Sequence, residues 1–273
     1  MAGSVEHLKR RKGAFRIALI PPEVLQALND GLLETVNLNE FLALELPRLA
    51  RSVAGQIGID AAHERLDDTL AMLASFKPMK RHDHVARALY DIAALHPERD
   101  AIAHRIATHP SDAARCWAAQ WITLSGLDLP RQLQAVRRFA ADPHFGVREI
   151  AWMAVRDAVV ASLDEALELL QPWVRDADPN IRRFASELTR PRGVWCAQIE
   201  ALKAEPWLAL PLLEPLKADG SRYVQNSVAN WLNDASKTQG EWVESVAARW
   251  LAASDAPATR YIVRRALRTL SRA

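Results

Sequence analysis

Four side chains in the middle of the sequence have types and spacing that suit them to act together. Phe145, Glu149, Trp152 and Arg156 follow one another at intervals of four, three and four residues, which places them on one face of a helix. A carboxylate between two aromatic rings is poorly hydrated and acts strongly on a developing positive charge. Glu149 is therefore a candidate catalytic residue. The alternative is a first-turn Glu favoured by the helix dipole, with Arg148 and Trp152 as ordinary packing neighbours.

A second polar row lies further along the chain. Asn226, Asn230, Asn233 and Lys237 recur at intervals of four, three and four residues, and Trp231 stands beside them. Asn is a mediocre helix former because its side chain competes for backbone hydrogen bonds. A row of three therefore indicates either polar recognition of a ligand or a solvated helix face.

Arginines form two rows at helical spacing. One contains Arg183 and Arg190 around Glu187, with Arg192 following, and the other contains Arg260, Arg264 and Arg268. Guanidinium groups at such intervals can follow successive phosphates of a nucleic acid. Alternatively, they are exposed arginines that pair weakly with nearby acids such as Glu187 or Asp255.

Sharper chemical motifs are missing from the sequence. It has no phosphate-binding glycine loop, no nucleophile elbow and no His-Glu-x-x-His pair. The two cysteines, Cys116 and Cys196, are too far apart for a zinc motif, and His82 and His84 diverge on a helix. We therefore expect no metal, no cofactor and no nucleotide hydrolysis.

Charge and hydropathy indicate a water-soluble chain with local basic surface. The net charge of the 273 residues is only +2, but residues 1–20 carry five basic groups against one acid. Such a basic N-terminal arm is typical of a surface that meets phosphates. No stretch reaches 18 apolar residues and no secretion signal is evident. We expect a cytoplasmic, nucleoid-associated monomer without membrane contact.

The elements that must position these residues are helices. Apolar residues recur at three and four, and prolines stand between the apolar runs. A turn that begins with Asp and leads into an amphipathic helix recurs, so that the equivalent positions Val147, Ile181, Val224 and Ile262 are 34, 43 and 38 apart. These intervals predict an all-α, curved solenoid of HEAT-like repeats with a concave basic groove. We expect one domain over 1–273: the basic arm 1–20, N-terminal helices over 21–100, and clearer repeats carrying the site over 101–273.

Three segments resemble the AlkC branch of the AlkC/AlkD superfamily, which consists of DNA glycosylases built from HEAT-like repeats. They are Phe145-Gly-Val-Arg-Glu-Ile-Ala-Trp, Arg182-Arg-Phe-Ala-Ser-Glu-Leu-Thr-Arg-Pro-Arg-Gly-Val-Trp and Ser227-Val-Ala-Asn-Trp-Leu-Asn-Asp-Ala-Ser-Lys. Weaker likeness extends over most of the chain. Some longer members add an immunoglobulin-like domain, and we expect none after Arg272.

The resemblance implies a role for each candidate residue. Glu149 is then the catalytic carboxylate that faces the deoxyribose of a damaged nucleotide. Residues expected to contact the sugar or the lesion are Phe145, Trp152, Asn230 and Trp231. Residues expected to contact DNA are Arg148, Arg183, Arg190, Arg192, Asn226, Asn233 and Lys237.

The function that the resemblance implies is removal of cationic N-alkylated bases from duplex DNA by hydrolysis of the N-glycosidic bond. Lesions of the 3-methyladenine, 3-methylcytosine and 7-methylguanine types fit this chemistry. Two alternatives remain open on the residues alone. One is a DNA-binding repeat protein that recognises damaged or distorted duplex without catalysis, and the other is a protein-interaction scaffold.

Overall fold

The computed structural model describes residues 5–193 and 196–272, and helices are the regular elements throughout this part of the chain. The chain forms two compact units. Unit 1 contains residues 1–126 and 144–151, and unit 2 contains 127–143 and 152–273. The expected all-α class is confirmed. In the described residues, no helix is long and apolar enough to cross a membrane.

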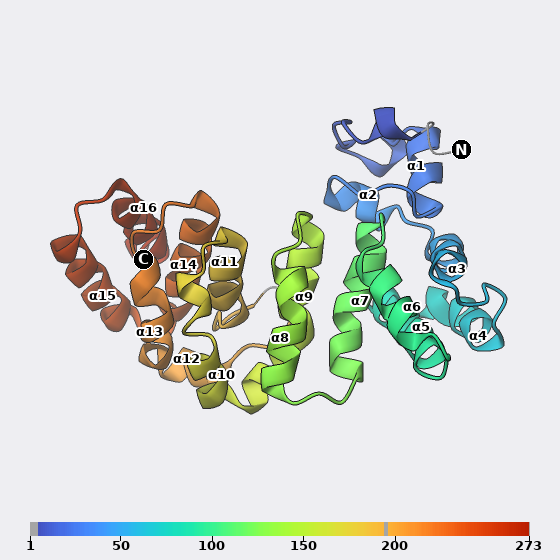
Figure 1. The fold of residues 1–273 in the computed structure, drawn as a ribbon. Coiled ribbons are helices and arrows are strands. Elements are labelled where there is room, and N and C mark those ends of the chain that lie inside the picture. Colours follow the sequence, from blue (N-terminus) through green and yellow to red (C-terminus); the bar gives the residue numbers. More distant parts are fainter. Residues whose placement is uncertain (1–4, 194–195, 273) are drawn as a thin grey trace. The chain divides into compact units, whose positions relative to one another are not determined.

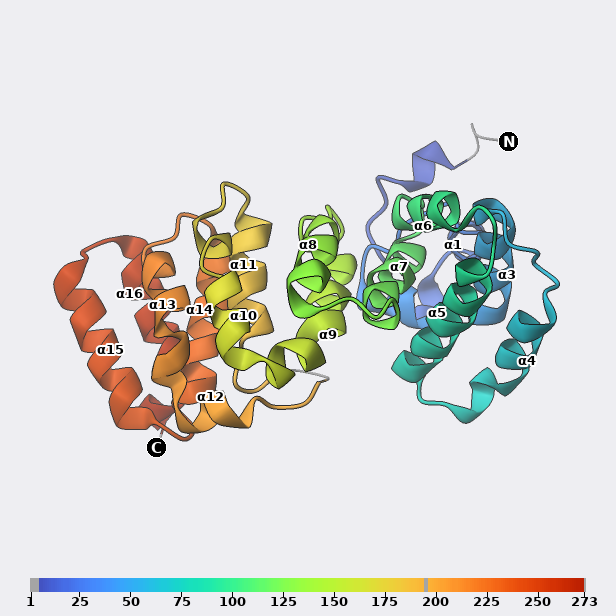
Figure 2. The ribbon, with the colours of Figure 1, turned by 60° about the horizontal axis from the view of Figure 1, so that its bottom comes forward.

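Unit 1 is a stack of short helices that pack mostly on their sequence neighbours (Figures 1 and 2). α3 packs against α1, α5 and α6, while α7 packs against α5 and α6. Its elements are η2 (Glu6–Leu8), η3 (Ile17–Leu19), α1 (Pro22–Asn29), α2 (Leu38–Leu42), α3 (Leu46–Ile57), α4 (Glu64–Met72), η4 (Leu73–Ser75), α5 (Pro78–Ala94), α6 (Arg99–Ala107), α7 (Asp112–Leu124) and the start of α9 (Phe145–Ala161).

Unit 2 contains the clearer repeats, in which α11, α14 and α16 lie side by side (Figures 1 and 2). α8 packs against α11, and α15 packs against both α14 and α16. Its elements are α8 (Leu129–Ala140), the later part of α9, α10 (Leu163–Leu169), η5 (Trp173–Arg175), α11 (Pro179–Leu188), α12 (Glu200–Ala204), η6 (Pro206–Ala209), α13 (Leu210–Leu213), η7 (Glu214–Leu216), α14 (Arg222–Ala235), α15 (Gly240–Ala253), α16 (Pro257–Ala266) and η8 (Leu270–Arg272).

Local sequence signals set many helix starts. Pro78, Pro179 and Pro257 are the first residues of α5, α11 and α16, where the missing N–H costs nothing and the fixed φ suits a helix. The carboxylate of Asp178 accepts the backbone N–H of Asn180 at 2.8 Å and caps α11. These prolines begin helices, as the sequence predicts.

The recurring turn acidic residues do more than cap helices, because arginines of the preceding repeat bind them. Arg182 on α11 donates through Nε to the recurring Asp219 at 2.6 Å, and Arg137 on α8 pairs with Asp176, two residues before the recurring Asp178. The equivalent apolar positions of the repeats, such as Ile181 and Val224, are buried. Acidic residues of these turns therefore join one repeat to the next, while the apolar positions build the shared core.

The basic N-terminal segment is attached to unit 1 within its described part. The Arg11 guanidinium binds the buried carboxylate of Glu40, with 2.6 Å between Nη2 and Oε2. Residues 1–4 of the expected arm lie outside the described residues, as do Val194 and Trp195 of the second resembling segment.

Candidate active site

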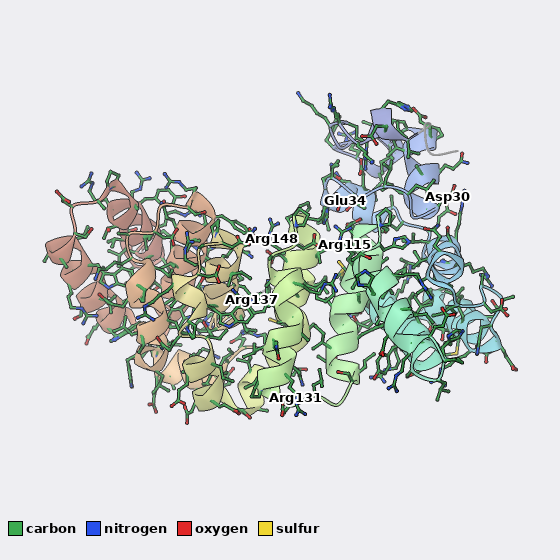
Figure 3. All side chains as sticks on the ribbon, in the orientation of Figure 1. Asp30, Glu34, Arg115, Arg131, Arg137 and Arg148 are labelled. Atoms are coloured by element: carbon green, nitrogen blue, oxygen red, sulfur yellow. The ribbon has the colours of Figure 1, made fainter. Side chains whose placement is uncertain are left out.

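The start of α9 presents the expected acid and one of its aromatic neighbours. Phe145 is the first residue of this helix and is 44% exposed. Glu149 follows one turn later and is partly exposed, and Arg148, labelled in Figure 3, is partly exposed beside it. The Phe145 ring stacks obliquely on the imidazole of His144, with 4.7 Å between ring centroids. A ring and a carboxylate therefore reach the surface on successive turns of the same helix.

Hydrogen bonds to distant parts of unit 1 fix the start of this helix. His144 Nε2 lies 2.6 Å from the carbonyl oxygen of Thr35, and the His144 Nδ1 accepts the N–H of Gly146 at 3.2 Å. Thr35 also donates its N–H and its hydroxyl to the buried carboxylate of Asp112, at 2.9 and 2.7 Å. Burial raises the pKa of Asp112 above its ordinary value. The turn that precedes Glu149 is thus tied to α7 and to the segment before α2.

A second charged contact supports the same region. The guanidinium of Arg115 on α7 pairs with Glu34, and both are labelled in Figure 3. Arg115 also donates to the carbonyl oxygen of His109 at 2.7 Å. These bonds hold residues 34–35 against α7, where Thr35 can reach both Asp112 and His144.

Trp152 and Arg156 are buried and contribute to packing rather than to the surface of the site. Trp152 is only 2% exposed, so its ring does not offer the surface that the expected lesion contact needs. The Arg156 guanidinium, buried near Trp152, donates to the carbonyl oxygens of Leu188 and Arg190, both at 2.7 Å. Burial lowers the pKa of Arg156. Its charge stabilises the carbonyl end of α11, where the helix dipole is negative.

Glu187 lies at the centre of a buried ion network that joins α11 to α14. Arg190 donates through Nη1 to Glu187 Oε1 at 2.6 Å and through Nε to Asp234 Oδ2 at 2.9 Å. Arg183 Nη2 lies 3.5 Å from Glu187 Oε2, to which the Ser227 hydroxyl donates at 2.7 Å. Burial alone raises the pKa of Glu187, but Arg183, Arg190 and Ser227 outweigh it and hold the pKa below its usual range.

This network places Arg190 between two carboxylates, so its charge is already satisfied inside the protein. Arg192 is less committed, with Nε 3.3 Å from the backbone oxygen of Asp234 and Nη1 3.4 Å from Gln198. Lys237 is exposed and its ammonium lies 3.4 Å from Asp234. The structure therefore brings Arg190, Arg192 and Lys237 together around Asp234, although Arg190 does not fit the expected phosphate contact.

The asparagine row of α14 faces α16. Asn226 accepts the hydroxyl of Tyr261 at 2.7 Å, and Asn230 accepts Arg268 Nη2 at 3.0 Å. Asn233 is buried and donates to the carbonyl oxygen of Ala266 at 2.9 Å. Each amide thus bridges two neighbouring helices. Helix bridging is a role that neither sequence-based interpretation included, and the buried Asn233 cannot reach DNA as placed.

Trp231 has no exposed surface, and its indole N–H donates to the backbone oxygen of Thr189 at 2.9 Å. The expectation that it contacts a lesion therefore does not fit this structure. Of the expected site residues, Phe145, Arg148 and Glu149 belong to unit 1, and the others belong to unit 2.

Sequence reasoning missed a set of arginine and tyrosine pairs at the starts of the repeat helices. The Arg183 guanidinium lies 4.2 Å from the ring centroid of Tyr223, and the Arg222 guanidinium lies 3.6 Å from that of Tyr261. The sequence does contain a signal for these pairs. An Arg-Tyr dipeptide, beginning at Arg222 and at Arg260, stands directly before the equivalent apolar residue of two repeats. Stacked guanidiniums keep their outer N–H groups available to an anion.

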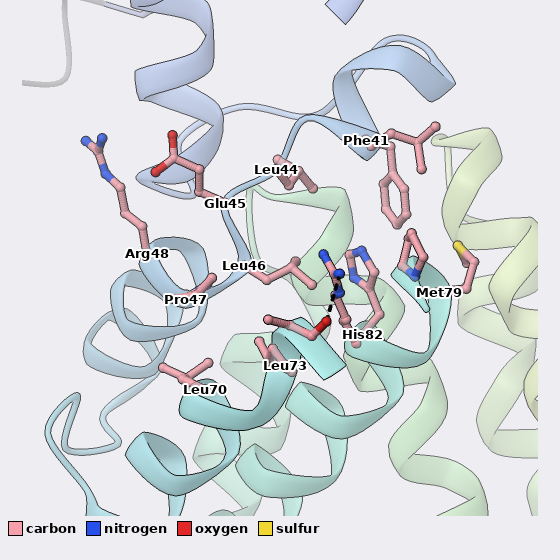
Figure 4. Close-up of a pocket in the computed structure, with 14 residues that line it drawn as sticks. Phe41, Leu44, Glu45, Leu46, Pro47, Arg48, Leu70, Leu73, Met79 and His82 are labelled. Carbon is pink, nitrogen blue, oxygen red and sulfur yellow. Dashed lines mark hydrogen bonds between the residues drawn. The ribbon is translucent and has the colours of Figure 1, made fainter. Parts of the chain in front are cut away.

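A cavity of about 490 Å³ opens elsewhere in unit 1, between α2, α3, η4 and α5 (Figure 4). Its lining is mostly apolar, and none of the expected site residues belongs to it. His82 stacks on Phe41 at 4.6 Å and accepts the Trp117 indole N–H at 3.2 Å. Burial lowers the pKa of His82 to about 4. No group of three or more possible metal ligands is gathered in the described residues.

Comparison with known proteins relates the repeats of unit 2 to DNA repair proteins. A family model described as DNA alkylation repair enzyme matches residues 147–270. This match covers somewhat less than half of the chain. The alkylpurine DNA glycosylase AlkC of Pseudomonas fluorescens, solved bound to DNA containing an abasic site analogue, superimposes with a TM-score of 0.71 at 29% identity, covering 85% of this chain and 64% of AlkC. The expected resemblance to the AlkC branch is confirmed.

One further solved structure and one further protein sequence are similar to this chain. AlkD2 of Streptococcus mutans matches with a TM-score of 0.56 at 20% identity, over 75% of this chain and 98% of its own. This likeness supports the expected helical-repeat fold, which is shared with AlkC and AlkD proteins. The uncharacterized protein YhaZ of Bacillus subtilis is 41% identical over 117 residues, which are 43% of this chain and 32% of YhaZ. The matched part thus spans about a third of YhaZ, and the AlkC match spans less than two thirds of AlkC.

Proposed function

We propose that this protein is a monofunctional DNA glycosylase that releases cationic N-alkylated bases from duplex DNA. The observation that carries the proposal is the start of α9, where the partly exposed Glu149 stands one turn after the half-exposed Phe145. Likeness to AlkC, an alkylpurine DNA glycosylase in a DNA complex, supports it. We propose DNA with 3-methyladenine, 3-methylcytosine or 7-methylguanine as the substrate class.

The chemistry needs few protein groups. Alkylation of a ring nitrogen makes the base cationic and a good leaving group, so breaking its N-glycosidic bond requires little help from a general acid. The barrier then lies mainly in the sugar, which becomes a cation as the base departs. The carboxylate of Glu149 stabilises that cation and orients, or deprotonates, the attacking water. Phe145 excludes water from one side of the sugar.

The other expected site residues fall into two groups, those exposed enough to contact DNA and those buried in the protein. We propose Arg148, Arg183 and Arg192 as phosphate contacts, with Lys237 adding a weaker one. Arg190 positions the helices instead, because Glu187 and Asp234 already neutralise it. Asn226 and Asn230, partly exposed, remain available for contact at their amide nitrogens, whereas Asn233, Trp152 and Trp231 act from the interior.

Release of free base from alkylated duplex tests the proposal. Glu149→Gln keeps the shape of the side chain but removes its charge, and we expect the single-turnover rate to fall on the order of 10²-fold or more. Binding to an abasic-analogue duplex should change little. The matched control is Glu165→Gln, which removes an exposed carboxylate from α10 and should leave the rate unchanged.

The outcomes separate the alternatives. Salt-sensitive duplex binding without release of any of the three bases would replace the glycosylase with a non-catalytic DNA-binding protein. Equal rates for wild type and Glu149→Gln would remove Glu149 from the site. A chain that binds no duplex at any ionic strength would favour the protein-interaction scaffold.

A further inference from the structure

Residues 9–19 form a surface segment whose ends are held in the core of unit 1. Leu8 and Ile20, which flank it, are buried in one apolar cluster with residues of α1. Arg11 donates to both carboxylate oxygens of the buried Glu40, at 3.1 and 2.6 Å, and also to the Leu8 carbonyl oxygen at 3.0 Å. The segment is thus anchored at both ends and through Arg11.

A second anchor fixes the backbone next to the exposed part. The carbonyl oxygen of Ala14 accepts the side-chain amides of Asn37 and Asn39, at 2.9 and 3.1 Å. Gly13 approaches so closely that a Cβ there would lie 2.3 Å from Asn37 Nδ2. A side chain at position 13 would require the side chains of Asn37 and Val36 to move. The backbone that leads into Phe15 is therefore held firmly against α2.

The anchored segment presents large apolar side chains to solvent. Phe15 is 74% exposed, and Ile17 and Leu19 on η3 are about half exposed. α2 packs against η3 and adds Leu38, which is 60% exposed. Apolar side chains gathered on a firmly held surface indicate a binding site rather than a fraying terminus.

The same segment carries exposed cations. Arg10, Lys12 and Arg16 are exposed, and none of them forms an ion pair with another residue in the described part of the chain. The neighbouring Lys9, by contrast, pairs with Glu6 at 2.7 Å. The Arg16 guanidinium lies 5.7 Å from the Phe15 ring centroid. The surface therefore combines free positive charge with an exposed aromatic ring.

We infer that residues 9–19, here called the N-terminal contact loop, bind duplex DNA from its minor groove. Arg10, Lys12 and Arg16 contact phosphates, and Phe15 enters between the sugars and the base edges as an apolar wedge. Minor-groove proteins combine cations and apolar wedges in this way. The inference rests on the proposed function for its choice of DNA as the partner.

Charge and length argue against other occupants. A second copy of the chain would bring like charges together, because the same cations would face one another. A membrane-surface anchor needs a sustained amphipathic helix, whereas η3 has three residues. A duplex offers phosphates to the cations and an apolar sugar and base surface to Phe15.

Salt-dependent binding of an undamaged duplex tests the inference without any base-release step. The triple variant Arg10→Gln, Lys12→Gln, Arg16→Gln should reduce the slope of log K against log salt by about 2–3 units, since each phosphate contact contributes about 0.9. Phe15→Ala should weaken binding on the order of tenfold. Exposed residues of the same unit serve as controls, Leu95→Ala for the ring and Arg99→Gln for the cations, and both should bind as wild type does.

A spectroscopic readout reports the wedge itself. A duplex carrying 2-aminopurine should brighten when wild type binds, because unstacking relieves quenching, and should stay dim with Phe15→Ala at saturation. Unchanged salt slope and unchanged fluorescence in variants with wild-type melting temperatures would overturn the inference. So would loss of anionic-vesicle binding or of self-association in these variants with duplex binding intact. Wild type that binds through this loop yet releases no base would overturn the proposed function alone.

Discussion

At the scale of single residues, the same side-chain type serves different purposes according to its neighbours. Arg183, Arg190 and Arg192 are alike in sequence, yet Arg190 is held by two buried carboxylates while Arg192 makes only long contacts. A buried guanidinium whose charge is matched twice contributes to helix packing. An arginine with spare N–H groups can still bind a phosphate.

Replacing Arg190 tests this division. Arg190→Met removes the cation and leaves Glu187 and Asp234 buried with less compensation, so the free energy of unfolding should fall by about 3–5 kcal/mol. Urea denaturation measures this change. Arg260→Met, at an exposed position on α16, is the control and should shift the midpoint little. An unchanged midpoint for Arg190→Met would mean that the network does not stabilise unit 2.

Sequence reasoning located some of these residues but not their surroundings. Spacing correctly grouped Arg183, Glu187 and Arg190, because three- and four-residue intervals define a helix face. It did not foresee Asp234 as a partner of Arg190, since that contact joins residues 44 apart. For the same reason the burial of Trp231 was missed, because its covering residues come from other helices.

At the scale of elements, the orientation of α9 depends on contacts with residues distant in sequence. The turn at His144 is bonded to Thr35, 109 residues earlier, and Thr35 is bonded to Asp112 on α7. A local signal such as Pro143 can mark where a helix begins. It cannot specify which distant carbonyl orients that helix.

Removing the Thr35 hydroxyl should loosen the start of α9. Thr35→Val keeps the shape but leaves Asp112 Oδ2 without its 2.7 Å donor, which should cost about 1–3 kcal/mol. Amide hydrogen exchange at residues 146–149 should accelerate relative to α14. Thr69→Val, at an exposed hydroxyl on α4, is the control. Unaltered exchange at 146–149 would show that Thr35 does not hold this helix start.

The asparagine row allows a parallel test on α16. Asn233→Ala deletes the donor to Ala266 and Thr269, both at 2.9 Å, and should lower the free energy of unfolding by about 1–3 kcal/mol. Asn230→Ala, at a partly exposed position, should cost less stability. Equal losses for the two variants would contradict the burial difference between them.

At the scale of the whole molecule, the helical period and the recurring turns were enough to predict the all-α repeat fold. Each repeat buries its apolar face on its neighbours, so the pattern of Val147, Ile181, Val224 and Ile262 contains the packing information. The division into two units was not predicted. The division depends on which helices pack together, and the spacing of apolar residues along the sequence does not specify these partners.

The stability of the molecule should fall in mild acid because two histidines are buried in neutral form. Burial lowers the pKa of His82 to about 4, and burial together with Arg115 lowers that of His109 to about 4. Between pH 6.5 and pH 4 the unfolded chain binds protons that the folded chain does not, so stability falls as the pH drops through this window. The expected slope is about 1.4 kcal/mol per pH unit for each histidine.

Urea denaturation across this pH range measures that slope, and His82→Gln should reduce it by the share of one histidine. His84→Gln is the control on the same helix. Below pH 4.5, stability should decline further as the pH approaches the lowered pKa of Glu187, because its ionised form is the one favoured by folding. The raised pKa of Asp112 acts in the opposite sense, so the difference between variants is decisive: an unchanged slope in His82→Gln would contradict the burial of His82 in neutral form.

The order of segments along the chain limits how the protein can be divided. The chain leaves unit 1 after Gly126, passes through unit 2 over residues 127–143, returns to unit 1 for residues 144–151 and then remains in unit 2. No single cut therefore yields two fragments that each contain one complete unit. Splitting or truncating the chain would separate α9 from part of its surroundings. The catalytic role proposed for Glu149 should therefore need an unbroken polypeptide or fragments that reassociate.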